Sequence, residues 1–165
     1  MLKIGEKYVY GTVGVVELVD VREETVLGQT RKYYVLRAKG AQDSSLTFVP
    51  CDSELARREL RPLLARAELT EMSREAKARP TDEWIPDAKR RTERFRSVIA
   101  SGDRSELVSL IGAIYREGKR RALEGKRNFL QDESAMKRAE HILYSEISEV
   151  FSIPEADVPE LIRKL

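Results

Sequence analysis

The chain has 165 residues, of which 41% are hydrophobic and 35% are charged, and its formal net charge is +2. This content of aliphatic residues excludes a disordered chain, and the length fits one domain or two small ones. The charge is unevenly distributed: residues 88–127 hold twelve basic and five acidic side chains, whereas residues 128–165 hold four and eight. Such a basic block is typical either of a polyanion-binding surface or of a solvated helix face.

Residues 1–50 alternate between apolar and polar side chains and are rich in β-branched and aromatic types. Strands are indicated over residues 8–10, 13–21, 32–37 and 46–49, and glycine marks the turns between them. Short strands at this spacing predict a small barrel or a strongly bent sheet.

Helical signals begin after Pro50. Asp52 or Ser53 can cap a short helix that ends at Leu60, and residues 67–79 form a further short helix. Residues 80–86 are rich in helix breakers. A third helix is expected from residue 86 or 87 to residue 100. The predicted buried stripe of that helix consists of Ala88, Thr92, Phe95 and Ile99.

The remaining boundaries follow from capping signals. Gly102 can end the third helix, and Asp103 can begin the next, which fades near Gly125. Asp132 can cap the last long helix, and Pro154 lies at the start of a short final segment. We therefore predict an α+β chain, with a β domain over residues 1–52 and a helical domain over residues 53–165.

The groups needed for catalysis are not brought together by any motif. His141 and Cys51 are the only histidine and the only cysteine, and the turn from Gly11 to Gly14 lacks the pattern of a phosphate-binding loop. We expect no enzyme activity, no catalytic residue, no cofactor, no metal site and no small-molecule substrate. A single cysteine, a start without the apolar core of a signal peptide and no long apolar run predict a cytoplasmic protein with no membrane partner.

A family resemblance begins at Lys3, where the chain reads Lys-Ile-Gly-Glu-Lys-Tyr-Val-Tyr-Gly-Thr-Val-Gly-Val-Val. This is similar to the K-x-G-D-x-V-V-Y-P-x-x-G-V-G-x-V pattern that opens CarD/CdnL transcription regulators, a module also found in the transcription-repair coupling factor. Gly28 followed by Tyr-Tyr-Val-Leu-Arg at 33–37, then Val49-Pro50 and Leu60-Arg61, continue the family order. The resemblance covers essentially the whole chain and is strongest in the N-terminal half.

The resemblance implies a Tudor-like bent sheet that adds one edge strand to a sheet of the RNA polymerase β subunit. The candidate polymerase-binding residues are Arg22, Arg37, Leu46, Thr47, Phe48 and Val49. Phe48 is the main candidate contact, and its alternative is an ordinary core aromatic.

For the helical domain, the resemblance implies contact with promoter DNA at the upstream edge of the melted −10 region. The family's W-x-R-R pattern aligns on Ala88-Lys89-Arg90-Arg91, so its tryptophan is missing here, and Trp84 lies four residues earlier. Trp84 either wedges into the minor groove or packs against the helices. The candidate DNA-binding residues, which contact mostly backbone phosphates or the minor groove, are Trp84, Lys89, Arg90, Arg91, Arg94, Lys119, Arg120 and Arg121.

Two other classes of function compete with this one. A polymerase-bound adaptor would use its helical domain to bind another protein instead of DNA, and the missing tryptophan favours it. An enzyme acting on nucleic acid would need a carboxylate cluster or a nucleophile that the sequence does not offer.

Overall fold

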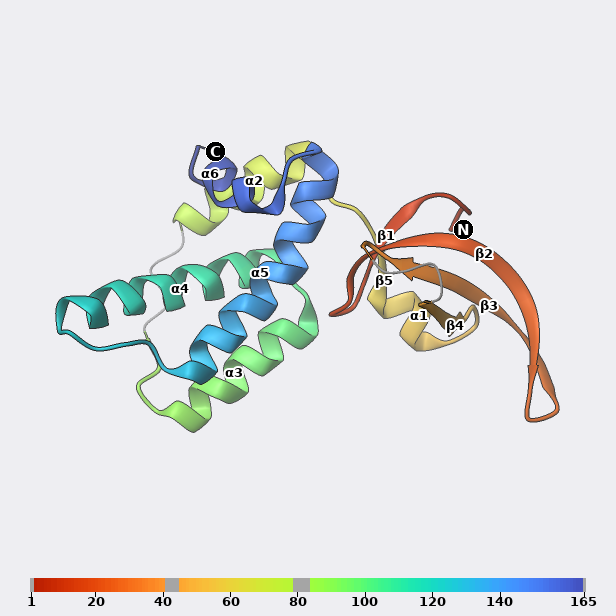
Figure 1. Cartoon of the computed structure of the whole chain (residues 1–165), viewed down its shortest axis with the longest axis horizontal. Helices are drawn as coiled ribbons and strands as arrows, with labels where there is room; N and C mark the ends of the chain where they lie inside the picture. The colour runs from red at the N-terminus through yellow and green to blue at the C-terminus, as the bar shows by residue number, and fades with distance from the viewer. Residues whose placement is uncertain (1, 41–44, 79–83, 165) are drawn as a thin grey trace. The chain divides into compact units, whose positions relative to one another are not determined.

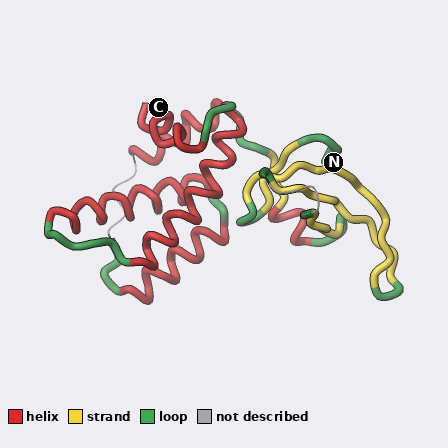
Figure 2. Tube along the Cα trace, in the orientation of Figure 1, coloured by secondary structure: helices red, strands yellow, loops and turns green. Residues whose placement is uncertain are grey.

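The computed structural model describes residues 2–40, 45–78 and 84–164. The chain forms two compact units, residues 1–63 and residues 64–165, and strands occur in the first while the second is helical (Figures 1 and 2). The α+β prediction, with an N-terminal sheet and a helical remainder, is confirmed. The boundary lies later than the predicted 52/53 because the segment after Pro50 returns to the sheet as a last strand before the helical unit begins.

The sheet is antiparallel and open, with the strand order β4-β3-β2-β1-β5. Its strands are β1 (Lys7–Tyr10), β2 (Gly14–Val26), β3 (Gln29–Ala38), β4 (Leu46–Pro50) and β5 (Leu60–Pro62), and helix α1 (Glu54–Glu59) links β4 to β5. Of the two predicted architectures, the structure has the bent sheet and not the closed barrel. Ser53 caps α1 by accepting a hydrogen bond from the Ala56 N–H, as its position in the sequence predicts.

The bend comes from β2, which is long enough to pair with β1 at one end and with β3 at the other. Its register with β3 shifts between Leu18 and Asp20, a β-bulge that bends the strand and strengthens its twist. From Glu23 and Lys32 onward, past the end of β4, β2 and β3 continue as a two-stranded ribbon (Figure 1). The ribbon turns at Leu27 and Gly28, both at positive φ, which is the geometry of a type I′ hairpin.

One face of the sheet, β5 included, forms a core with α1. Alternate residues of each strand point into it because the side-chain period of a strand is two. The buried members of this core are Tyr8, Val16, Leu18, Leu36, Val49, Ala56 and Leu60.

The second unit contains five α-helices and one 3₁₀ turn within its described residues. They are α2 (Arg66–Ala78), α3 (Ala88–Ser101), α4 (Arg104–Leu123), α5 (Leu130–Phe151), η1 (Glu155–Asp157) and α6 (Val158–Lys164). The Asp87 and Asp103 side chains cap α3 and α4, and Gly102 ends α3 at a φ of 61°, as the sequence predicts.

Two predictions for this unit are wrong. Helix α5 begins at Leu130, with Phe129 at the N-cap position, so Asp132 lies in its first turn and is not its cap. The buried stripe of α3 is Arg91, Phe95, Val98 and Ile99, whereas Ala88 is exposed and Thr92 is half-buried. The buried face of α3 differs from the one predicted because Arg91, a charged residue, occupies a core position.

Two apolar clusters hold the helices together. One joins α3, α4 and α5 through Phe95, Val98, Ile99, Leu107, Leu110, Ile114, Ala139 and Ile142. The other joins the start of the unit to α5 and α6 through Leu64, Leu69, Met72, Leu143, Ile147 and Val158. Burial of this kind contributes roughly 25 cal/mol for each Å² of apolar surface removed from water.

A buried carboxylate fixes the first residue of the helical unit. The Leu64 N–H donates to Glu146 Oε1 at 2.8 Å, and Arg104 Nε donates to Oε2 of the same side chain at 3.0 Å. Because Glu146 is buried, these donors replace the water that its charge would otherwise require. Glu146 of α5 thereby links Leu64, where the helical unit begins, to Arg104 of α4.

Candidate docking edge and basic groove

Strand β4 lies at one edge of the sheet. Within the described part of the chain, β3 is the only strand that pairs with it. Its side chains differ in exposure: Val49 is buried in the core, Leu46 is half-buried, Thr47 is exposed and Phe48 is 43% exposed. An open edge strand presents backbone donors and acceptors to which another strand can pair.

The register shows which donors of β4 face outward. The Cys51 N–H donates to the Lys32 carbonyl at 2.9 Å, and in an antiparallel ladder hydrogen-bonded pairs alternate with pairs that are not. The backbone N–H groups of Thr47 and Val49 therefore point toward β3. The backbone N–H groups of Leu46 and Phe48 point to the open edge. Pro50, which has no N–H, occupies the next outward-facing position.

Phe48 lies on the outer face of the sheet, so its alternative role as a core aromatic is wrong. The Arg22 guanidinium carbon lies 5.0 Å from the centre of the Phe48 ring, and the Tyr33 ring meets it edge-on at 6.5 Å. Arg22 Nε is also 3.3 Å from a Glu24 carboxylate oxygen. A cation held over a partly exposed ring favours an aromatic and arginine contact site beside the edge.

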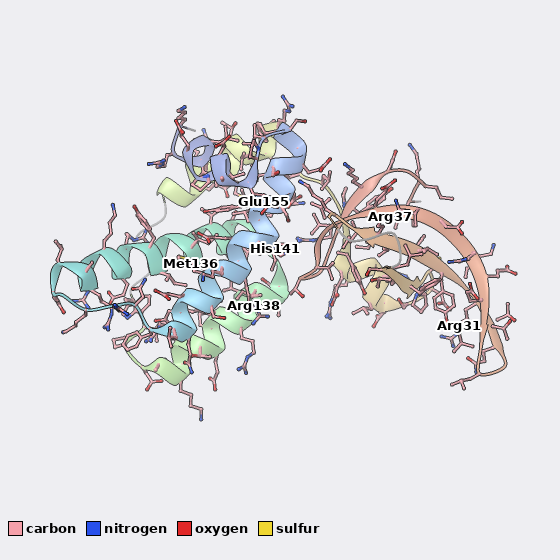
Figure 3. All side chains as sticks on the ribbon, viewed as in Figure 1. Arg31, Arg37, Met136, Arg138, His141 and Glu155 are labelled. Atoms are coloured by element: carbon pink, nitrogen blue, oxygen red, sulfur yellow. The ribbon has the colours of Figure 1, made fainter. Side chains whose placement is uncertain are left out.

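Arg37 takes a different place from Arg22. It is half-buried on β3, where its neighbours in register are Glu17 on β2 and Leu46 on β4 (Figure 3). The structure thus brings five of the six predicted polymerase-binding residues to one edge and its outer face. Val49 is the exception, because its side chain is enclosed in the core.

Arg91 is not available to DNA, and its prediction as a DNA contact is wrong. Its side chain is 3% exposed, and Nε donates to both carboxylate oxygens of Asp132, at 3.0 and 3.2 Å. Nη1 donates to the carbonyl oxygens of Ile85, at 2.8 Å, and Pro86. This arginine ties the entry of α3 to the first turn of α5, and removing one partner of such a buried pair is costly.

Trp84 is part of the same assembly. Its ring packs edge-on against Phe95 at 6.2 Å and lies 4.7 Å from the Arg91 guanidinium, at the margin of the α3–α4–α5 core. Of the two roles left open by the sequence, the structure favours packing over a minor-groove wedge.

The predicted DNA contacts near the end of α4 are Lys119, Arg120 and Arg121, and the two arginines are engaged within the protein. Arg120 pairs with Glu117 and Glu124, and its guanidinium lowers the pKa of the Glu117 carboxyl. Arg121 donates to the Arg127 carbonyl at 2.8 Å and stacks on the Phe129 ring. Lys119 is exposed, with its ammonium 4.7 Å from the Tyr115 ring centre. Arg120 and Arg121 therefore stabilise the end of α4 and the loop after it.

Two other basic side chains, and the carboxylate of Asp132 that Arg91 pairs, line a groove between α3 and α5. Its volume is about 350 Å³, and Arg96 and Arg138 line it together with hydroxyl and amide groups of Thr92, Gln131 and Ser134. Lys89 and Arg90 are exposed on α3, and Arg94 lies 3.1 Å from a carboxylate oxygen of Glu106. Groups of this kind can hold phosphate oxygens without reading sequence.

Sequence reasoning missed Arg138 because it belongs to the acidic part of the chain. In Figure 3 it lies on the side of α5 that faces α3, which brings it to the groove that Arg96 also lines. The useful signal was the helical period: Ala139, Leu143 and Ile147 define the buried face of α5, which leaves Arg138 at its edge.

Within residues 2–40, 45–78 and 84–164, no cluster of three or more His, Cys, Asp or Glu side chains is arranged to hold a metal ion. None of the helices described for this chain has the length and apolar character needed to cross a membrane. Comparisons of the chain with protein-family models and with curated proteins give no match.

Proposed function

We propose that this chain is a CarD-type transcription regulator. In this proposal the open edge of β4 docks on the RNA polymerase β subunit, and the basic groove between α3 and α5 contacts promoter DNA. The observation that carries it is the position of Leu46–Phe48, which the family motif assigns to docking and which lies on an open edge with an exposed aromatic beside it. Added strands bind such edges through backbone hydrogen bonds, and side chains supply selectivity.

The DNA half of the proposal rests on fewer residues than the sequence predicts. Arg91 is excluded by its burial, and a Trp84 wedge is left out because the ring is packed against Phe95. The remaining contacts are Lys89 and Arg90 on the exposed face of α3, with Arg96 and Arg138 in the groove. Contacts of this type bind the phosphate backbone, and their affinity falls steeply as salt rises.

Tethering makes such weak DNA contacts sufficient. A helical domain held on polymerase meets nearby DNA at an effective concentration on the order of millimolar. If it binds the open promoter complex better than the closed one, it shifts that equilibrium by its difference in affinity, with no chemical step.

A pull-down of the isolated polymerase β subunit tests the docking half. We expect the wild-type protein to be retained and Phe48→Asp to be lost. Thr25→Asp, on the exposed ribbon away from the edge, is the matched control and should bind like wild type. Loss of binding in both variants, or in neither, contradicts a docking site at β4.

Open-complex lifetime tests the DNA half. Charge reversal at Arg96 and Arg138 together, the two arginines that line the groove, should shorten the lifetime while retention on the β subunit persists. An unchanged lifetime would exclude this groove as the DNA contact.

The burial of Arg91 and the packing of Trp84 favour one competing function, a polymerase-bound adaptor whose helical domain binds another protein. A salt titration separates the two candidates. DNA contact predicts promoter-DNA affinity that falls with salt, alone and with polymerase present, whereas the adaptor shows no such affinity in either case.

A further inference from the structure

A second groove lies on the other side of α5, where α4, α5 and α6 meet. Its volume is about 450 Å³, within the range of small-molecule sites. Val108, Ile111, Met136, Leu143 and Ile162 supply a mostly apolar lining. In Figure 3, Met136 lies between α5 and α4, on the opposite side of α5 from Arg138. The groove is therefore separate from the basic one and is not used by the proposed function.

Two polar groups on α5 interrupt this apolar lining. They are the Glu140 carboxylate and the Tyr144 hydroxyl, one helical turn apart. Burial raises the pKa of Tyr144 to about 12, and the charge of Glu140 adds to the increase. Burial also raises the pKa of Glu140. A carboxylate in this position is destabilised by its loss of water and is favoured by a cation.

Glu140 is half-buried, and the charge of Lys137 offsets only part of the effect of its burial. Within the described residues, no hydrogen bond reaches the Glu140 carboxylate or the Tyr144 hydroxyl. Lys137, one turn earlier on α5, is the one cation that acts on Glu140, and its side chain is exposed and outside the groove. Arg163 lines the groove from α6 but donates to the Pro159 carbonyl of its own helix. Tyr115, on α4, is paired with Lys119.

We propose that the groove between α4, α5 and α6 binds a small apolar molecule that carries a protonated amine, with the amine at Glu140 and Tyr144. The apolar body is buried against the aliphatic lining, and the ammonium donates to the carboxylate and to the phenol oxygen. The ammonium supplies a hydrogen-bonding partner for the half-buried carboxylate and replaces the part of its hydration that burial removes. A neutral or anionic molecule of the same shape lacks that gain.

The test uses three probes of one shape: 3-phenylpropylamine, 3-phenylpropanol and 3-phenylpropionate. Titration of the full chain, followed by calorimetry and by NMR shifts, should show the amine binding about tenfold or more tightly than the alcohol, because a charge-assisted hydrogen bond is the stronger one. The carboxylate should bind weakest. Shifts should concentrate on Ile111, Met136 and Ile162.

Glu140→Gln should abolish the preference for the amine, whereas Glu133→Gln, on the same helix outside the groove, should leave it unchanged. In the wild type, the amine should also lower the pKa of the Glu140 carboxyl, measured by NMR titration. Equal affinities for all three probes, no binding of the amine, or shifts located elsewhere would overturn the proposal. The comparison of probes does not depend on any variant, so it holds even if Glu140→Gln unfolds.

Discussion

Arg22 of the sheet unit and two arginines of the helical unit, Arg91 and Arg104, differ in what their charge is used for. In the sheet, Arg22 lies on the outer face, where it covers an exposed ring and faces acidic neighbours. In the helical unit, Arg91 and Arg104 reach inward to the buried carboxylates of Asp132 and Glu146. Arg22 therefore marks a candidate binding surface, whereas Arg91 and Arg104 are internal supports of the helical unit. A cluster of basic residues in a sequence does not distinguish these roles.

The sharpest test compares two adjacent arginines on α3. Arg91→Ala leaves Asp132 buried without its cation and should lower the free energy of unfolding by about 3–5 kcal/mol. Arg90→Ala, at an exposed position, should change it by less than about 0.5 kcal/mol. Urea unfolding followed by circular dichroism measures both. Equal losses would mean that the buried pair does not carry the stability assigned to it.

Two proline substitutions test the docking edge through its backbone. Leu46→Pro removes an outward-facing N–H and should weaken binding to the β subunit while the sheet stays folded. Thr47→Pro removes a donor that faces β3 and should destabilise the sheet itself, by about 3 kcal/mol or less. Pull-down and thermal unfolding of both proteins separate the two effects. A stable Thr47→Pro sheet would show that the ladder phase assigned to β4 is wrong.

A third test asks whether promoter DNA contacts the groove between α3 and α5 or the end of α4. Arg138→Ala should reduce the slope of log affinity against log salt for promoter DNA by about 1, the effect of one lost phosphate contact. Arg120→Ala should leave that slope unchanged, because Arg120 is engaged with Glu117 and Glu124. Fluorescence anisotropy at several salt concentrations gives both slopes. A larger change of slope for Arg120→Ala than for Arg138→Ala would place the DNA contact at the end of α4 instead of the groove.

The smallest effect is expected at the tip of the β2–β3 ribbon. Leu27 is fully exposed and has a φ of 53°, a region in which leucine is strained by roughly 1 kcal/mol. Leu27→Asn should therefore raise the free energy of unfolding by up to about 1 kcal/mol, because asparagine favours this turn. Thermal unfolding measures the gain, and Val26→Asn, at an extended position, should show none.

The local elements were predictable because their signals lie within a few residues. The caps at Ser53, Asp87 and Asp103 and the helix end at Gly102 each depend on a contact inside one turn. The edge position of β4 also follows from the motif order. These features need no knowledge of which helices pack together.

The candidate site was less predictable because it depends on contacts between distant residues. Asp132 has the sequence context of a cap, yet it pairs with Arg91, 41 positions earlier. With this pair formed, α3 packs with Arg91 on its buried face and Thr92 at the groove. Arg138 joins Arg96 only through the packing of α5 on α3. Helical periodicity could reduce the number of candidate arginines. Only the tertiary contacts distinguish an arginine that can bind a partner from one that is buried in an internal ion pair.

Pro50 has a consequence for aggregation that extends beyond docking. As the last residue of β4, it ends the outward-facing row of donors, so an incoming strand finds an N–H at Leu46 and Phe48 and none at Pro50. A ladder this short suits a partner segment of a few residues and cannot template the long continuous pairing of a cross-β fibre. Pro50 therefore limits strand addition at the β4 edge to a segment of a few residues.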